Sequence, residues 1–375
     1  MGSKIIKSKG KLKSIGANDK LINIKSDYFL RKVFDNIPKK ISLEIIKYNK
    51  NIQKRLNINI SNYKEYSEIF SSIEIEIIPM KEHKYGQFIN IFKGYEKYYH
   101  IYFNNNKKEE IKRTDFGADD KIQKINIIID YKIESFYNLF SSCKRIKSIN
   151  FKKFCRKNID NMSRMFHECS GLKELNLSNF NTSNVFTMDE MFLGCSSLKV
   201  LNVSNFNTKK VFNMNQMFKG CSSLEELDLS NFNTNNVNKM KGMFSLCTSL
   251  KELNISNFNT NYVNDMTKMF YKCSSLKKLN LSNFNTNNVE EMTFMFKGCS
   301  SLEELNISNF NTDNVTVMYG MFCGCASLKE LDLSNFNTNN VTNMSGMFYD
   351  CSIPLKMKVF KEYKNFKREV FDGIY

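Results

Sequence analysis

The chain repeats itself every 26 residues over a large part of its length. The pentapeptide Ser-Asn-Phe-Asn-Thr recurs seven times without insertion or deletion, and its phenylalanine stands at Phe180, Phe206, Phe232, Phe258, Phe284, Phe310 and Phe336. Self-similarity at a fixed period of this size is typical of solenoids, in which each repeat forms one coil that stacks on the next. The repeat therefore predicts an array of stacked coils.

The unit at residues 250–275 shows what each part of a coil is expected to do. Leu253 and Ile255 alternate with Asn254, which predicts a strand with one buried face. The polar pentapeptide then turns the chain, because Asn and Ser side chains bond to nearby backbone groups. Apolar residues follow at a spacing near three: Val263, Met266, Met269, Phe270 and Cys273. This spacing predicts a short helix or 3₁₀ turn on the return side.

The array is expected to begin and end in atypical coils. Ile122, Ile125 and Ile127 repeat the strand spacing weakly, and they predict the strand of a first coil. Met357 and Val359 fall on the strand positions that follow Leu331 and Leu333, and they predict a degenerate last strand. Terminal coils that differ from the consensus are what capping repeats look like.

The residues 247–272 read CTSLKELNISNFNTNYVNDMTKMFYK, and the other units are close copies. These units resemble the 26-residue leucine-rich repeats of the BspA-like class, which occurs in bacterial surface proteins, mycoplasma lipoproteins and many protist proteins. Phe180 and its equivalents stand where the ribonuclease-inhibitor type has asparagine, so that type is the poorer match. The resemblance implies an α/β repeat fold, a curved leucine-rich-repeat solenoid of about nine to ten coils that binds other macromolecules. It implies no catalytic residue.

The segment ahead of the repeats predicts an α+β N-terminal cap. Residues 27–70 carry helical spacing interrupted at Pro38, and residues 72–103 alternate with the period of strands. The helical part faintly resembles an F-box, with apolar positions at Phe29, Leu30, Val33, Phe34, Ile37 and Leu43. The alternative is a generic amphipathic helical cap. The expected division is a flexible N-terminus at 1–22, a helical segment at 23–70, a β-rich cap at 71–121, the solenoid at 122–359 and a basic tail at 360–375.

Charge is concentrated at the N-terminal end of the chain. Residues 1–157 hold 34 Lys and Arg against 17 acidic residues, a net of +17, which equals the net charge of the whole chain. A basic region of this kind is attracted to nucleic acid, anionic lipid or an acidic protein. The basic residues form no dense block and no nucleic-acid-binding motif accompanies them, so a protein partner is expected and nucleic acid is not.

Nine of the eleven cysteines follow the repeat: Cys143, Cys169, Cys195, Cys221, Cys247, Cys273, Cys299, Cys325 and Cys351. Side chains in one column of stacked coils lie about 5 Å apart with parallel Cα–Cβ vectors, which does not suit a disulfide. Buried, reduced thiols are expected instead. Residues 1–20 lack the apolar stretch of a signal peptide, and no apolar run is long enough to span a membrane. Together these features predict a cytoplasmic protein.

The sequence shows no constellation that would support catalysis. Histidine occurs three times, at His83, His100 and His167, and no zinc-ligand spacing, glycine-rich phosphate loop or nucleophile motif is found. No enzyme activity, catalytic residue, cofactor or metal site is expected.

Sequence variation between repeats concentrates on the return segment, whereas the outward strand positions at Asn254 and its equivalents are monotonous. Exposed aromatic residues flanked by charges are typical of binding hot spots. The candidate partner-binding residues are Phe186, Asp189, Glu190, Leu193, Phe212, Gln216, Tyr262, Asp265, Tyr271, Glu290, Glu291, Phe294, Val317 and Tyr319. The alternative is drift at unconstrained solvent positions.

The sequence therefore predicts a non-catalytic scaffold for protein–protein interaction. Two alternatives stay open, a substrate receptor of a ubiquitin ligase that docks through the F-box-like segment and a cell-surface adhesin of the BspA-like kind. The identity of the partner and the oligomeric state are not indicated by the residues.

Overall fold

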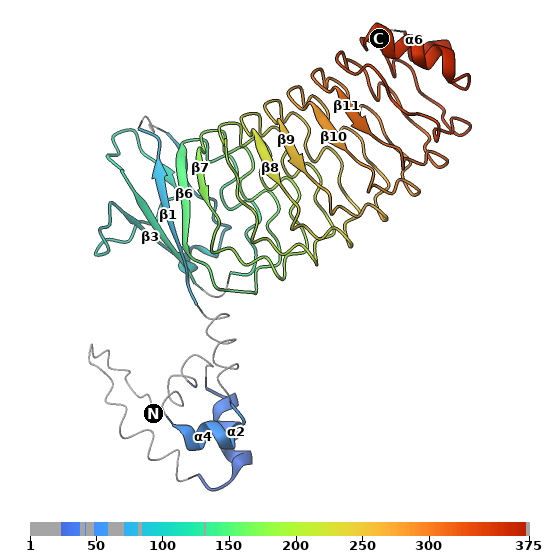
Figure 1. Ribbon diagram of the computed structural model, residues 1–375. Coiled ribbons are helices and arrows are strands. Elements are labelled where there is room, and N and C mark those ends of the chain that lie inside the picture. The colour runs from blue at the N-terminus through green and yellow to red at the C-terminus, as the bar shows by residue number, and fades with distance from the viewer. Residues whose placement is uncertain are drawn as a thin grey trace. The chain divides into compact units, whose positions relative to one another are not determined.

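A computed structural model describes residues 24–37, 42, 49–58, 71–81, 85–130 and 133–372 of the chain (Figure 1). The chain forms two compact units, Met1–Ser71 and Ser72–Tyr375. The segment 1–22, expected to be flexible, lies outside the described residues.

The first unit contains two short capped helices. Helix α2 spans Asp27–Asp35, and the Ser26 side chain accepts a hydrogen bond from its first turn. Helix α4 spans Lys50–Arg55 and is capped in the same way by Asn49. Leu30, Phe34 and Ile52 form a small buried cluster between the two helices. Of the other apolar positions of the F-box-like pattern, Phe29 is 64% exposed, Val33 and Ile37 are half-buried, and Leu43 lies outside the described residues.

The second unit opens with a five-stranded sheet. Its strands are β1 (Ile73–Pro79), β3 (Tyr99–Phe103), β5 (Ile125–Ile129), β6 (Ile146–Lys153) and β7 (Glu174–Asn176), in the order β3-β5-β1-β6-β7. β1 pairs antiparallel with β5 and β6, and β3 pairs antiparallel with β5. The short pair β2 (Gly86–Gln87) and β4 (Asp115–Phe116) and the 3₁₀ turn η1 (Glu96–Tyr98) complete this region.

The expected first coil at Ile122–Ile127 is therefore wrong. β5 has the alternating burial that the sequence indicated, but β1 lies between β5 and β6, so β5 belongs to the antiparallel cap. The strand spacing is the same in both arrangements, and only the pairing partners differ. Parallel stacking begins between β6 and β7, where Ile149 lies beside Leu175.

From β7 onward the coils are in strict register, and each strand is short. The remaining strands are β8 (Glu226–Asp228), β9 (Glu252–Asn254), β10 (Lys278–Asn280) and β11 (Glu304–Asn306). β8 pairs parallel with β9 and β10 with β11, so that Leu227 lies beside Leu253 and Leu279 beside Leu305. These strands follow one another along one side of the unit (Figure 1).

The return side of each coil is a ladder of turns, which corrects the expected helix or 3₁₀ segment. Between residues 154 and 352, all of which the structure describes, no helix of either kind occurs. In the coil that contains Met188, the N–H groups of Met188 and Met191 bond in different directions. Met188 donates to the Asn213 carbonyl of the next coil at 3.0 Å, and Met191 donates back to the Met188 carbonyl at 3.2 Å. Turns within a coil thus alternate with hydrogen bonds between coils.

Two residues in each coil adopt a left-handed backbone conformation, which makes this turn ladder possible. One column contains Glu190 with φ 53°, and the same column carries Gly242 with φ 58°. The other contains Gly194 with φ 72° and Lys272 with φ 55°. Glycine adopts such angles without steric cost, whereas other residues do so only when the surroundings enforce it. The stacked neighbours supply that constraint here.

Columns of identical side chains fill the interior of the coils. One phenylalanine column runs continuously from Phe140 to Phe348, with adjacent rings 5.4 to 5.9 Å apart and nearly parallel. The cysteine thiols lie beside it, and Cys195 Sγ donates to the Phe166 carbonyl at 3.1 Å. All eleven cysteines are free thiols, and the nine that follow the repeat are buried, as expected.

The threonine that closes the Ser-Asn-Phe-Asn-Thr motif connects neighbouring coils from within. Thr260 is 1% exposed, and its hydroxyl donates to the Asn285 carbonyl and accepts from the Asn285 N–H, both at 2.8 Å. The first asparagine of the motif reaches the preceding coil, as Asn205 does when its amide donates to the Phe180 carbonyl at 3.1 Å. The motif is therefore a repeated connection between coils as well as a turn.

Each end of the array is closed by residues that imitate a missing coil. At the first coil, Asn90 donates from its backbone to the Leu139 carbonyl at 2.7 Å and from its side chain to the Ser141 carbonyl at 2.7 Å. At the last coil, Gly346 donates to the Glu369 carbonyl and Phe348 to the Val370 carbonyl. Groups at both edges of the turn ladder thereby gain hydrogen-bond partners.

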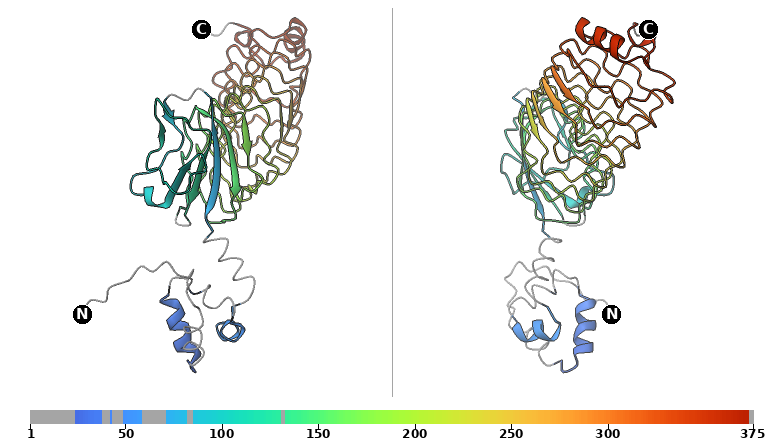
Figure 2. Two further views of the ribbon diagram at one scale, coloured as in Figure 1. Left: turned by 90° about the vertical axis from the view of Figure 1, so that its left-hand side faces the viewer. Right: turned by 45° about the vertical axis from the view of Figure 1, so that its right-hand side comes forward.

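The C-terminal segment differs from the expected degenerate strand and basic tail. Met357 and Val359 lie in helix α6 (Ile353–Glu362), and the 3₁₀ turn η2 (Arg368–Val370) follows it. Ser352 caps α6 and a proline stands in its first turn, which favours a helix over another strand. Figure 2 shows α6 at the end of the coils, and the buried Val370 belongs to the core.

Candidate interaction surfaces

The return face carries the predicted partner-binding residues, and they differ in exposure. Phe186, Phe212 and Tyr262 are 46%, 43% and 65% exposed, and Glu290 is exposed as well. The other candidates are half-buried: Asp189, Glu190, Leu193, Gln216, Asp265, Tyr271, Glu291, Phe294, Val317 and Tyr319. Most of the predicted surface is therefore partly engaged in the turn ladder.

Three of the predicted residues come together in one aromatic cluster, defined here as Tyr271, Phe294 and Tyr319. The Phe294 ring lies 4.9 Å from the Tyr319 ring and 6.3 Å from the Tyr271 ring, centroid to centroid. Lys297 Nζ lies 4.4 Å from the Phe294 centroid, and Lys268 Nζ lies 5.8 Å from both the Tyr271 and Phe294 centroids. Half-buried rings with cations over their faces form a compact patch that is both apolar and positive.

Several predicted acids act inside the fold. Asp189 Oδ1 accepts hydrogen bonds from Ser163 Oγ at 2.5 Å and from Thr187 Oγ1 at 2.6 Å. Glu190 Oε2 accepts from Arg164 Nε at 2.8 Å. Each of these contacts joins or orders neighbouring turns, so these acids have a structural task.

Asp265 is the clearest case of such an acid. Burial raises the pKa of its carboxyl, but hydrogen bonds from Thr267 and Lys241 outweigh burial and leave the pKa below its ordinary value. The Lys241 Nζ lies 2.9 Å from Asp265 Oδ2. The carboxylate is thus held in its charged form between two coils.

Backbone geometry explains part of the sequence variation between repeats on the return face. Glu190, Gln216 and Phe294 stand in the left-handed column that carries glycine in other coils, with φ angles of 53°, 53° and 56°. The remaining exposed rings lie apart from the aromatic cluster. Phe186 and Phe212 adjoin each other in earlier coils, where the Phe212 N–H donates to the Phe186 carbonyl at 2.9 Å.

The strand face carries a second outward column beside the asparagines. The outward positions two residues ahead of the asparagine column are glutamate in five of seven coils and differ only at Val200 and Lys278: Glu174, Val200, Glu226, Glu252, Lys278, Glu304 and Glu330. Val200 is 77% exposed.

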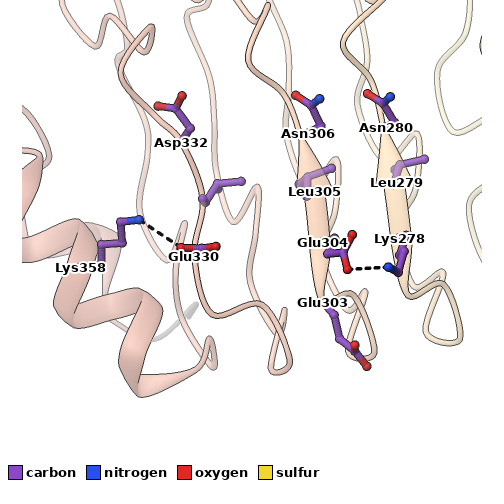
Figure 3. Close-up of a pocket in the computed structure, with 11 residues that line it drawn as sticks. Lys278, Leu279, Asn280, Glu303, Glu304, Leu305, Asn306, Glu330, Asp332 and Lys358 are labelled. Carbon is purple, nitrogen blue, oxygen red and sulfur yellow. Dashed lines mark ion pairs between the residues drawn. The ribbon is translucent and has the colours of Figure 1, made fainter.

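A shallow groove lies on this face next to α6 (Figure 3). Lys278 Nζ lies 2.6 Å from Glu304 Oε1, and Lys358 Nζ lies 3.5 Å from Glu330 Oε2. Glu303 and Asp332 also line the groove, so acidic side chains outnumber the lysines. The Lys278–Glu304 pair links one coil to the next, and the Lys358–Glu330 pair links α6 to a coil. Both pairs are solvent-exposed, which limits their contribution to stability.

The half-buried His167 and the buried cysteine side chains outside these surfaces pack among the coils. Burial lowers the pKa of His167, whose Nε2 lies 3.4 Å from Glu190 Oε2. Burial raises the pKa of the Cys169 and Cys247 thiols to about 12, which keeps them protonated. Within the described residues, no three His, Cys, Asp or Glu side chains gather as a metal site would require. In the same part of the chain, every helix is too short or too polar to cross a membrane.

The repeat region matches a known family. A family model described as "Mycoplasma protein of unknown function, DUF285" matches residues 134–251, 194–301 and 271–359. The chain belongs to this family. The matched ranges leave out residues 23–70, and the F-box-like interpretation of that segment has no support from them. A search of curated proteins found no match.

Among solved structures, the DUF285 chain is similar to bacterial leucine-rich repeat proteins. A leucine-rich repeat protein of T. pallidum is 20% identical, with a TM-score of 0.32, over 48% of this chain and 83% of that chain. A leucine-rich repeat protein of Eubacterium ventriosum is 17% identical, with a TM-score of 0.35, over 52% of this chain and 57% of that chain.

Proposed function

We propose that the chain is a non-catalytic scaffold for protein–protein interaction, and that a partner binds its return face at the aromatic cluster. The observation that supports this function is the convergence of Tyr271, Phe294 and Tyr319 under Lys268 and Lys297. Aromatic residues dominate binding energy at interfaces, and rings that are already held in place lose little conformational entropy on binding. The turn ladder provides that rigidity.

The positive flank of the cluster suits a partner that presents apolar side chains next to carboxylates. Lys297 and Lys268 stand over the rings and are free to meet such groups at the rim. Charged residues at a rim guide association, while the rings in the centre supply most of the affinity. We place this interaction in the cytoplasm, and the eleven free thiols support a reducing compartment.

The test is a site-specific photocrosslink in the native cytosol. A photoreactive phenylalanine replaces Tyr319 in one variant and Tyr262 in the other, because Tyr262 is an exposed aromatic residue of the same face outside the cluster. The crosslinked product is expected at position 319 and not at position 262. Equal crosslinking at both positions would contradict binding at the cluster.

A second measurement gives the contribution of the cluster to the binding affinity. Tyr319→Ala is expected to weaken binding of the identified partner by more than about tenfold, since hot-spot side chains contribute at least ~2 kcal/mol. Tyr262→Ala serves as the matched control and is expected to leave the affinity unchanged. Cell fractionation tests the compartment, and recovery of the protein at the cell surface would favour the adhesin alternative over the cytoplasmic scaffold.

A further inference from the structure

Helix α6 closes the last coil with only one of its faces. Leu355 and Val359 are fully buried against the coil. The opposite face carries Ile353, Met357 and Phe360, which are 69%, 68% and 69% exposed. Their spacing of four and then three residues places them in one row along the helix. We call this row the apolar stripe.

The apolar stripe is not explained by the capping role. A terminal repeat that serves only as a cap presents a polar outer face, because this keeps the end of a solenoid soluble. Glutamate or lysine at Met357 and Phe360 would satisfy that requirement without disturbing Leu355 or Val359. A shallow hollow beside the stripe reaches Phe371, whose ring centroid lies 6.4 Å from that of Phe360.

Cations surround the apolar stripe. Residues 353–372 hold six Lys and Arg against three acidic residues, a net of +3. Lys358 is paired with Glu330, and Lys364 Nζ lies 5.6 Å from the Phe360 centroid. Lys356, Lys358 and Lys361 line the hollow with one acid, Glu362, and neither Lys356 nor Lys361 forms an ion pair with any residue that the structure describes. The stripe is therefore apolar in its centre and positive at its margins.

We propose that the apolar stripe of α6 docks on an anionic lipid surface. Apolar side chains of a surface helix enter the boundary between headgroups and acyl chains, while the lysines beside them contact the anionic headgroups. A second copy of the chain is disfavoured, because a two-fold contact through α6 would bring Lys356 and Lys361 against the same lysines of the other copy.

The geometry of α6 favours lipid over an acidic protein. Its three apolar side chains form a single row with similar exposure. Such a row can enter the fluid surface of a membrane, which needs no shape complementary to the helix. The helix is also ordered before contact, because Ser352 caps its first turn and Leu355 and Val359 fix it on the last coil. Docking therefore involves little loss of conformational freedom. An acidic protein is the competing occupant.

The experiment is co-sedimentation of the full chain with vesicles of two compositions. One contains phosphatidylcholine alone, and the other contains phosphatidylcholine and phosphatidylserine in a three-to-one ratio. Binding to the second composition is expected, with a loss at high salt because the lysine contacts are screened. Phe360→Ser is expected to weaken this binding by about tenfold or more, since removal of one buried phenylalanine is worth at least that factor. Lys361→Glu is expected to weaken it by about fivefold or more.

Tyr262→Ser provides the matched control, because Tyr262 is 65% exposed and lies on the return face away from α6. It is expected to bind vesicles as the unmodified chain does, and circular dichroism verifies that all variants are folded. Failure of the unmodified chain to bind anionic vesicles would overturn the assignment to lipid. Equal losses in Phe360→Ser and Tyr262→Ser would overturn it as well. Binding of polyglutamate through Phe360 without binding of vesicles would instead assign the stripe to an acidic protein.

Discussion

The buried threonine column gives the sharpest prediction about stability. Thr260→Val keeps the size and the β-branch of the side chain and removes only the hydroxyl. That hydroxyl is the partner of both the N–H and the carbonyl of Asn285, each at 2.8 Å. Because Thr260 is 1% exposed, water cannot take its place without rearrangement.

The magnitude follows from the two backbone groups that lose their partner. Each unsatisfied buried N–H or carbonyl costs about 1–3 kcal/mol, so Thr260→Val is expected to lower the free energy of unfolding by roughly 2–6 kcal/mol. The matched control is Thr338→Val at the end of the array. The Thr338 hydroxyl donates to the Asn365 carbonyl at 3.2 Å in an exposed setting, and its loss is expected to cost less than about 1 kcal/mol.

Urea unfolding followed by far-ultraviolet circular dichroism measures the difference between the two variants. Both the midpoint and the slope are informative, because a weakened central coil divides a repeat array into parts that unfold separately. A midpoint of Thr260→Val equal to that of Thr338→Val, with an unchanged slope, would refute the reasoning. The coils would then depend on apolar packing alone.

Two further predictions concern titratable groups. Alkylation of the native protein is expected to label Cys155, the one exposed thiol, and unfolding is expected to raise the count in mass spectrometry from one label to eleven; several labels before unfolding would contradict the packing of the cysteine column. Asp265 has a lowered pKa, so its contribution to stability is present above the ordinary aspartate range and is lost as the pH falls below about 4. Asp265→Asn is expected to make the melting temperature less dependent on pH in that range, and an unchanged pH profile would show that the contacts from Thr267 and Lys241 are weak.

The period, the buried columns and the parallel register were predictable, because each depends on spacing along the chain alone. Leu253 and its neighbours lie beside their equivalents as the repeat requires. The turn ladder was not predictable in the same way. It depends on left-handed angles at residues such as Glu190 and Lys272, and their side chains give no sign of that conformation. Spacings of three residues fit a series of turns as well as a helix.

The predictions for the two ends of the array were wrong for different reasons. Val359 was assigned to a strand by its distance from Leu333, although Ser352 and Pro354 form the capped start of a helix and outweigh the periodicity. The β5 strand was identified correctly, but its neighbours in the sheet depend on β1, which lies far away in sequence. Local patterns indicate a strand without indicating its partner.

The residues of the aromatic cluster could be predicted from the sequence, but the contacts between their rings could not. Tyr271, Phe294 and Tyr319 stand at different positions of their respective repeats, and only the turns bring their rings together. On the strand face, the column two residues ahead of the asparagines departs from glutamate only at Val200 and Lys278. The apolar stripe was not predicted from the sequence, because Met357 was assigned to a buried strand position.

The turn ladder gives the array an electrical polarity. In the coil that contains Met188, the Thr187 carbonyl accepts from the preceding coil, and the Met188 N–H donates to the next one. The peptide groups that precede Glu190, Phe192 and Gly194 have the same orientation. Each peptide carries a dipole of about 3.5 D, and dipoles aligned head to tail add. One peptide of the same coil is reversed, because the Phe186 N–H donates to the Asp160 carbonyl of the preceding coil. The four aligned peptides outnumber it, so the dipoles of the turn ladder point their carbonyl ends toward the cap and their N–H ends toward α6, the reverse of an α-helix, and they make the α6 end of the ladder its positive pole.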